Sequence, residues 1–171
     1  EYGAGMLRSA HHFMGYLDAG NYSANDASGE RLKIGKDLFA ERIAEKRPTI
    51  IVNRDNTLDW LGGRTFDFLW CHAVFGHMPP KDVEDTIANI RKAMHPGSVF
   101  LFSYDPPQGR DAGRRIVEED ARNWQQSLSF YREIADRHGY SVEDVSEIVR
   151  HYPSWRERIH LARMILRETR S

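Results

Sequence analysis

The segment from Thr65 to Tyr104 constrains the fold more than any other part of the chain. Phe66–Cys71 and Val99–Tyr104 are short and apolar at nearly every position, which is typical of strands covered on both faces by helices. Between them, Pro96 and Gly97 end a stretch whose apolar residues recur at helical spacing. Those apolar residues are Val83, Ile87, Ile90 and Met94. The segment therefore predicts two parallel strands joined by a right-handed helical crossover.

The composition limits the classes of partner and compartment. The chain has 171 residues, which suits a single domain over 1–171 with a substantial core. It carries 24 Lys and Arg against 25 Asp and Glu, so the charge gives no reason to expect nucleic acid or an anionic membrane as partner. No apolar run reaches the roughly 18 residues of a membrane span, and no secretion signal is visible. Cys71 is the single cysteine, which excludes an internal disulfide and fits a reducing compartment. We therefore expect a cytoplasmic protein, and its oligomeric state is left open.

Helices and strands alternate through the first part of the chain. The expected elements are a helix over Met6–Leu17, a short strand from Tyr22 that ends at Asp26, a helix capped by Ser28 that carries Leu32, Leu38, Phe39 and Ile43, and a strand over Thr49–Val52. This order is a doubly wound α/β pattern.

The last third predicts a different arrangement. We expect a mobile loop over 106–118, then a helix over Asn123–His138. The inner face of that helix is expected to consist of Trp124, Leu128, Tyr131 and Ile134. Strands over Tyr140–Ile148 and Ile159–Leu166 follow without a helix between them, so they should pair as an antiparallel hairpin at the sheet edge. The expected fold is a mostly parallel sheet with helices on both faces and a C-terminal antiparallel hairpin.

The first residues look like the end of a strand that runs into a glycine turn. Gly3 and Gly5 would let the backbone approach a ligand closely, and the helix behind would offer free N–H groups. Glycines that serve only the turn geometry are the alternative interpretation. Because the chain opens at the end of a strand, we expect natural sequence, including a central strand, before Glu1.

The glycine turn, the segment Thr65–Tyr104 and the closing hairpin together resemble a class I S-adenosylmethionine-dependent methyltransferase of the small-molecule type. The resemblance implies S-adenosylmethionine as cofactor. A dinucleotide fingerprint would have a further glycine where this chain has Arg8, which also argues against a nicotinamide cofactor. The implied cofactor-binding residues are Glu1, Gly3, Gly5, Asp26, Ala27, Asp55, Asn56, Cys71 and His72.

The resemblance also implies roles for these residues. Asp26 would accept hydrogen bonds from the ribose hydroxyls, although a carboxylate that caps the next helix is the simpler alternative. Asp55 would accept a hydrogen bond from the adenine amino group, and the backbone N–H of Asn56 would donate one. A solvated turn aspartate is the alternative interpretation of Asp55. Cys71 and His72 would lie along the methionine portion of the cofactor.

Two histidines are candidates for a general base. His77, with His72 second, would line the acceptor pocket or accept a proton, whereas a structural histidine near a helix start explains His77 equally well. A metal site built from these residues and Cys71 is disfavoured because their spacing matches no zinc pattern. Asp105 follows a strand and is expected in a loop near the acceptor.

The sequence thus predicts methyl transfer to a small-molecule acceptor by in-line displacement, and it does not identify that acceptor. Two alternatives stay open. One is a nicotinamide-dependent oxidoreductase with an ordinary dinucleotide-binding fold. The other is a non-catalytic fragment that keeps the methyltransferase fold.

Overall fold

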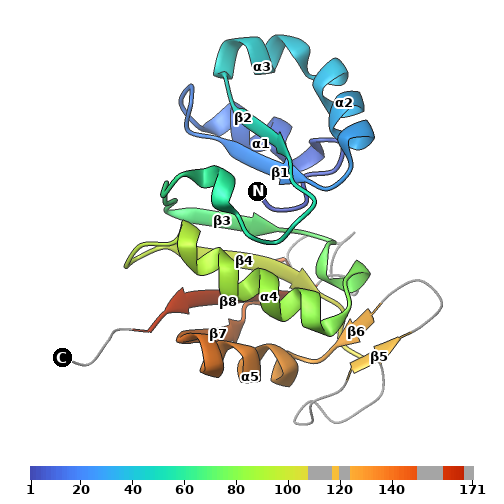
Figure 1. Ribbon diagram of the computed structural model, residues 1–171, viewed down its shortest axis with the longest axis vertical. Coiled ribbons are helices and arrows are strands. Elements are labelled where there is room, and N and C mark those ends of the chain that lie inside the picture. The colour runs from blue at the N-terminus through green and yellow to red at the C-terminus, as the bar shows by residue number, and fades with distance from the viewer. Residues whose placement is uncertain (108–116, 120–123, 150–159, 168–171) are drawn as a thin grey trace. The chain divides into compact units, whose positions relative to one another are not determined.

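Figure 1 shows the computed structural model, which describes residues 1–107, 117–119, 124–149 and 160–167. The chain divides into two compact units, Glu1–Asn56 and Thr57–Ser171. The expectation of one domain stays a prediction. Of the mobile loop expected over 106–118, residues 108–116 lie outside the described residues.

The first unit is built on a pair of short parallel strands. Its elements are α1 (Arg8–Tyr16), β1 (Ser23–Asp26), α2 (Gly29–Leu38), α3 (Ala40–Lys46) and β2 (Thr49–Val52). β1 pairs with β2 in parallel, from Ser23 opposite Thr49 to Asp26 opposite Val52. Tyr2 forms a single parallel bridge with Asn25, so the chain runs beside β1 before it enters the glycine turn.

The helix expected after Ser28 is interrupted at Phe39. Ser28 caps α2 as expected, because its hydroxyl accepts the backbone N–H of Arg31 at 3.2 Å. Phe39 then leaves helical geometry and separates α2 from α3. The ring of Phe39 stacks on His11 with centroids 4.9 Å apart, whereas Leu38 is 68% exposed. The single helix expected to carry Leu32, Leu38, Phe39 and Ile43 is therefore two helices. Leu38 follows the buried Leu32 by six positions, so it lies away from the buried side of α2.

α1, β1 and α2 enclose the core of the first unit. Leu7, Ala10 and Met14 give α1 a fully buried face, and Ala24 supplies the middle of β1. Further buried members are Ala4, Tyr22 and Leu32, with Phe13, Leu17, Phe39, Ile43 and Ile50 packed against them. This core holds the glycine turn in place, because the buried Ala4 and Leu7 lie on either side of Gly5 in the chain.

The second unit contains a mixed sheet. Its main elements are β3 (Phe68–Cys71), α4 (Pro80–Ile90), β4 (Val99–Tyr104), α5 (Leu128–His138), β7 (Tyr140–Asp144) and β8 (His160–Leu166). The strand order is β3-β4-β8-β7, in which β3 and β4 are parallel and β8 runs antiparallel to both of its neighbours. The strand–helix–strand unit and the antiparallel pairing of the last two strands are thus confirmed. The first of these two strands is shorter than expected, because β7 ends at Asp144 and Ser146–Ile148 form a 3-10 turn.

The helix expected over Asn123–His138 begins later than predicted. Trp124–Gln126 forms strand β6, which pairs antiparallel with β5 (Val117–Glu119). α5 starts only after Ser127, whose hydroxyl accepts the N–H of Phe130 at 3.3 Å. Placing Trp124 on the inner face of the helix was therefore wrong. Ser127 is a capping residue and the bulky Trp124 suits a strand, so the local signals were present.

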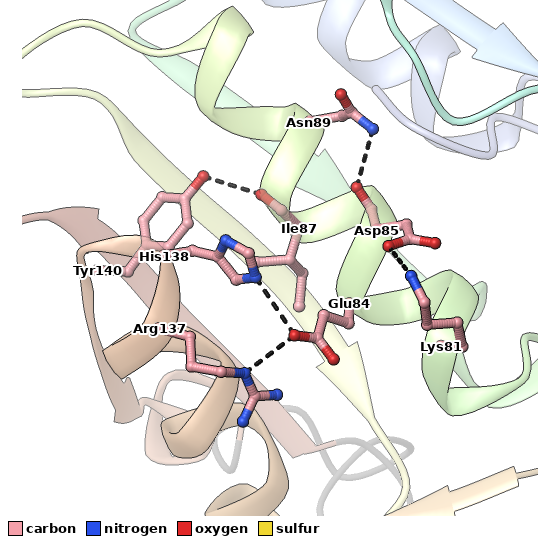
Figure 2. Close-up of polar contacts among 8 residues, drawn as sticks. All are labelled: Lys81, Glu84, Asp85, Ile87, Asn89, Arg137, His138 and Tyr140. Atoms are coloured by element: carbon pink, nitrogen blue, oxygen red, sulfur yellow. Dashed lines mark hydrogen bonds and ion pairs between the residues drawn. The ribbon is translucent and has the colours of Figure 1, made fainter.

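α4 and α5 lie on the same face of the sheet (Figure 1), and polar contacts join them (Figure 2). The carboxylate of Glu84 on α4 accepts a hydrogen bond from Arg137 Nε at 2.9 Å and lies 3.4 Å from His138 Nε2. The hydrogen bond from Arg137 lowers the pKa of Glu84. Phe100, Phe102 and Tyr104 of β4, all buried, face these helices, in keeping with strand alternation.

A buried tyrosine satisfies a carbonyl near the end of α4. The hydroxyl of Tyr140 donates to the backbone oxygen of Ile87 at 2.9 Å, as Figure 2 shows. α4 tightens into a 3-10 turn at Arg91–Ala93, and carbonyls in the last turn of a helix need partners from elsewhere. Burial also raises the pKa of Tyr140. The contact ties the start of β7 to α4.

Candidate functional site

The glycine turn has the backbone geometry that the sequence suggested. Gly3 has φ +73° and Gly5 has φ +53°, in the left-handed region that favours glycine. The backbone oxygen of Asn25 accepts the N–H groups of Gly3 at 2.9 Å and of Ala4 at 3.0 Å, which fixes the turn on β1. A Cβ added at Gly5 would meet no heavy atom within 4 Å, so the space beside it is open.

Asp26 lies between the glycine turn and the start of α2. Its Oδ2 accepts the N–H of Gly5 at 2.7 Å, and its Oδ1 accepts the N–H of Ser28 at 2.8 Å. The expected alternative, a carboxylate at the helix start, is therefore realised in part. An ionised carboxylate offers about four acceptor positions, so two hydrogen bonds leave room for ligand hydroxyls. Ala27, the next residue, is exposed.

The side chain of Glu1 is hydrogen-bonded within the first unit. The hydroxyl of Tyr22 donates to its Oε2. Burial raises the pKa of Glu1, and burial also raises the pKa of Tyr22. The contact ties the start of the chain to Tyr22, the residue before β1, and sequence reasoning missed this partner. A direct contact of Glu1 with a cofactor stays a prediction.

Asn56 lies beside the glycine turn. Its Oδ1 accepts the hydroxyl proton of Tyr2 at 2.8 Å, although 54 positions separate the two residues. Nothing in the local sequence signals that contact. Asp55 is exposed after the end of β2, as expected of either a ligand residue or a solvated turn aspartate. The first unit thus brings together the turn, Asp26 and Asn56.

In the second unit, Cys71 and His72 lie at the end of β3, and their contact with a cofactor stays a prediction. Cys71 ends β3 and is 1% exposed, so its thiol lies in the core. His72 stacks on Trp70, with ring centroids 5.6 Å apart and the planes inclined by 25°. The stack orients the imidazole along the sheet face that carries every second residue of β3.

His77 is the last residue of a short 3-10 turn, Phe75–His77, and its side chain is exposed. Phe75 anchors this turn, since it is fully buried with its ring 5.3 Å from Phe102 and 6.1 Å from Tyr131. The arrangement fits an accessible base as well as a surface histidine. A catalytic role for His77 or His72 therefore stays a prediction.

A buried amide network, which no local sequence pattern indicates, supports the same loop. Tyr131 donates its hydroxyl proton to Gln126 Oε1, and Gln126 Nε2 donates to the backbone oxygen of Met78 at 3.3 Å. The backbone N–H of Gln126 donates to the oxygen of Asp105 at 2.9 Å. A Cβ at Gly76 would lie 3.1 Å from Asp105 Oδ2, so this glycine allows the carboxylate to approach closely. Asp105 is thus in a loop beside the turn that holds His77.

Two negative findings apply to residues 1–107, 117–119, 124–149 and 160–167. Over those ranges, no group of three or more His, Cys, Asp and Glu side chains could hold a metal ion. Over the same ranges, no helix has the length and apolar character needed to cross a bilayer.

The α/β fold, with a glycine turn and acidic residues at strand ends, defines a protein of the class that binds ligands beyond the carboxyl ends of its strands. The chain belongs to the methyltransferase domain family, whose model matches residues 1–102. This membership confirms the resemblance to methyltransferases and the α/β fold class. No curated protein matches the chain in sequence.

Solved structures share the fold at low sequence identity. Magnesium protoporphyrin IX methyltransferase from Synechocystis PCC 6803, solved with bound SAM, is 15% identical with a TM-score of 0.69, covering 98% of this chain and 68% of that chain. The glycopeptide N-methyltransferase MtfA, complexed with S-adenosyl-L-homocysteine, is 17% identical with a TM-score of 0.71, covering 96% and 81%. The YcgJ protein from Bacillus subtilis is 15% identical with a TM-score of 0.71, covering 98% and 91%.

Proposed function

We propose that the protein transfers a methyl group from S-adenosylmethionine to a small-molecule acceptor. The observation that carries the proposal is the carboxylate of Asp26, which links β1 to the glycine turn through Gly5. Membership of the methyltransferase domain family supports it, and so do two fold neighbours whose structures contain SAM or its product. The small size of the acceptor rests on the sequence resemblance, and on those neighbours being named for a porphyrin and a glycopeptide.

The residues of the first unit fit a nucleoside. Asp26 keeps acceptor capacity for two ribose hydroxyls, and the open space beside Gly5 leaves the backbone accessible. Asp55 would accept from the adenine amino group, with the Asn56 backbone donating beside it. Cys71 and His72 are proposed to contact the methionine portion.

The cofactor supplies the activated methyl group when it is bound. What the protein must add is orientation of the acceptor and exclusion of water. A base is needed only where the acceptor is a hydroxyl or an ammonium group. His77, exposed on its turn, would then accept that proton at a ring nitrogen, with His72 as the second candidate.

Calorimetric titration of the protein with S-adenosylhomocysteine and, separately, with NAD tests the proposal. Binding of the first supports the methyltransferase, binding of NAD alone supports an oxidoreductase, and binding of neither supports a non-catalytic scaffold. Asp26→Asn keeps the shape of the side chain and removes its charge. We expect it to weaken S-adenosylhomocysteine by roughly tenfold or more, because hydrogen bonds to charged groups contribute about 1.5–3 kcal/mol.

Asp18→Ala is the matched control, because Asp18 is exposed in the same unit and lies outside the candidate site. Its affinity should equal that of the unaltered protein. An Asp26→Asn variant that binds as tightly as this control would remove Asp26 from the site.

A further inference from the structure

The chain just after β3 is bonded to a side chain of the neighbouring strand β4. Cys71 is the last residue of β3 in register with β4, where it lies opposite Phe102. Two residues later, the N–H of Ala73 donates to the hydroxyl of Ser103 at 2.8 Å. The side chain of Ser103 therefore takes the donor that would otherwise extend the ladder, and the chain turns away from the sheet at this point.

Ala73 has an unusual backbone conformation. Its φ is +55°, in the left-handed region that costs an L-residue about 1 kcal/mol or more. Such a conformation persists only where the surroundings impose it. The hydrogen bond from Ala73 to Ser103 is a local contact that can do so.

The residues around Ala73 are fixed on both sides. His72 stacks on Trp70 before it, and Phe75 is fully buried after it. Ser103 holds the middle of this short stretch. The backbone between the end of β3 and the turn that carries His77 is therefore fixed at three successive points.

We propose that Ser103 is a positioning residue, whose hydroxyl holds Ala73 in the left-handed conformation and so pre-organises the backbone after β3 to bind the methionine portion of the cofactor. The inference rests on the proposed function. Pre-organisation acts by removing the ordering cost from the binding step.

The test compares Ser103→Ala with Ser103→Thr, which keeps the hydroxyl, and with Ser141→Ala, a half-buried serine on β7 of the same sheet. We expect Ser103→Ala to weaken S-adenosylhomocysteine roughly fivefold by calorimetry, the factor that one hydrogen bond of about 1 kcal/mol corresponds to. Ser103→Thr should restore the affinity and Ser141→Ala should not change it. The urea midpoint of Ser103→Ala should match that of Ser141→Ala, because the contact from Ala73 is solvent-exposed.

Equal affinity of Ser103→Ala and the unaltered protein would overturn the inference, and so would a loss that Ser103→Thr fails to restore. Amide hydrogen exchange at Ala73 in the free protein tests the role of Ser103 without any ligand, and so separates that role from the proposed function. Slow exchange in the unaltered protein and fast exchange in Ser103→Ala is expected whatever ligand the site takes, and equal exchange would overturn the inference. If the unaltered protein binds no S-adenosylhomocysteine, the proposed function fails, and the exchange result still decides whether Ser103 holds Ala73.

Discussion

Replacement of Gly35 by alanine tests how closely α2 packs on the glycine turn. Gly35 is a buried helical glycine, and a Cβ there would lie 2.6 Å from the backbone C and O of Met6 and 2.8 Å from Leu7 Cγ. Since carbon atoms pack best at about 3.5–4.0 Å, α2 and the turn would have to separate by roughly 1 Å. Met6 and Leu7 directly follow Gly5, so the strain falls on the candidate cofactor turn.

The expected cost of Gly35→Ala follows from two opposing effects. Overpacking of a core costs typically 1–3 kcal/mol, and the better helix propensity of alanine returns up to about 1 kcal/mol. The net loss should be about 1–2 kcal/mol, because the obstructing atoms of Met6 are backbone atoms that cannot rotate away. Urea unfolding followed by circular dichroism measures it, and calorimetry should show weaker S-adenosylhomocysteine binding.

Gly15→Ala is the control, since Gly15 is an exposed glycine of α1 and a Cβ there would meet nothing within 4 Å. It should stabilise the protein by about 0.5–1 kcal/mol through helix propensity. The two glycine-to-alanine changes should therefore have opposite signs. If Gly35→Ala were as stable as Gly15→Ala, α2 would not lie against Met6 as described.

The remaining predictions concern the second unit. Tyr140→Phe should cost about 1–3 kcal/mol in urea unfolding, because the Ile87 carbonyl loses its buried donor, and an unchanged midpoint would contradict that contact. The pKa of Glu84 is lowered in the folded state, so its contribution is present above its ordinary value of 4.5 and is lost as pH falls through the folded pKa. Because Arg137 is 47% exposed, solvent screens the pair and its contribution is small. Glu84→Gln should reduce the difference in the free energy of unfolding between pH 7 and pH 3 by only about 0.5 kcal/mol, measured by urea unfolding of both proteins at each pH. Identical dependence of the two proteins on pH would contradict this prediction. For a hydroxyl or ammonium acceptor, His77→Ala should lower turnover more than cofactor affinity, and full activity would exclude His77 as the base.

Local sequence pattern correctly predicted the strands and helices that an unbroken run or periodicity of apolar residues indicates. Val99–Tyr104 and Thr49–Val52 were placed at their observed bounds, because short apolar and β-branched runs between turn residues indicate strands directly. α4 was predicted from a different signal, the recurrence of apolar residues at helical spacing. Phe39 and Trp124 misled the prediction because both look compatible with a helix, while tertiary packing at one and strand pairing at the other decided otherwise.

The site was predictable only in part. The sequence indicated Gly3, Gly5 and Asp26, because glycines and an acidic residue at strand ends are where this fold class binds ligands. The contacts from Tyr2 to Asn56 and from Ala73 to Ser103 join residues far apart in sequence, and no local spacing encodes them. The acceptor, the cytoplasmic location and the oligomeric state stay predictions or open questions.

The position of β8 has a consequence for biosynthesis. β8 is inserted between β4 and β7, so Val99 meets its partner Ile165 only after nearly all of the described chain has been translated. Domains fold as units while their polypeptide emerges from the ribosome, and pairings between distant segments form slowly. During translation β4 therefore exposes an open edge that awaits β8, and the nascent protein is most exposed to chaperones or aggregation in that interval.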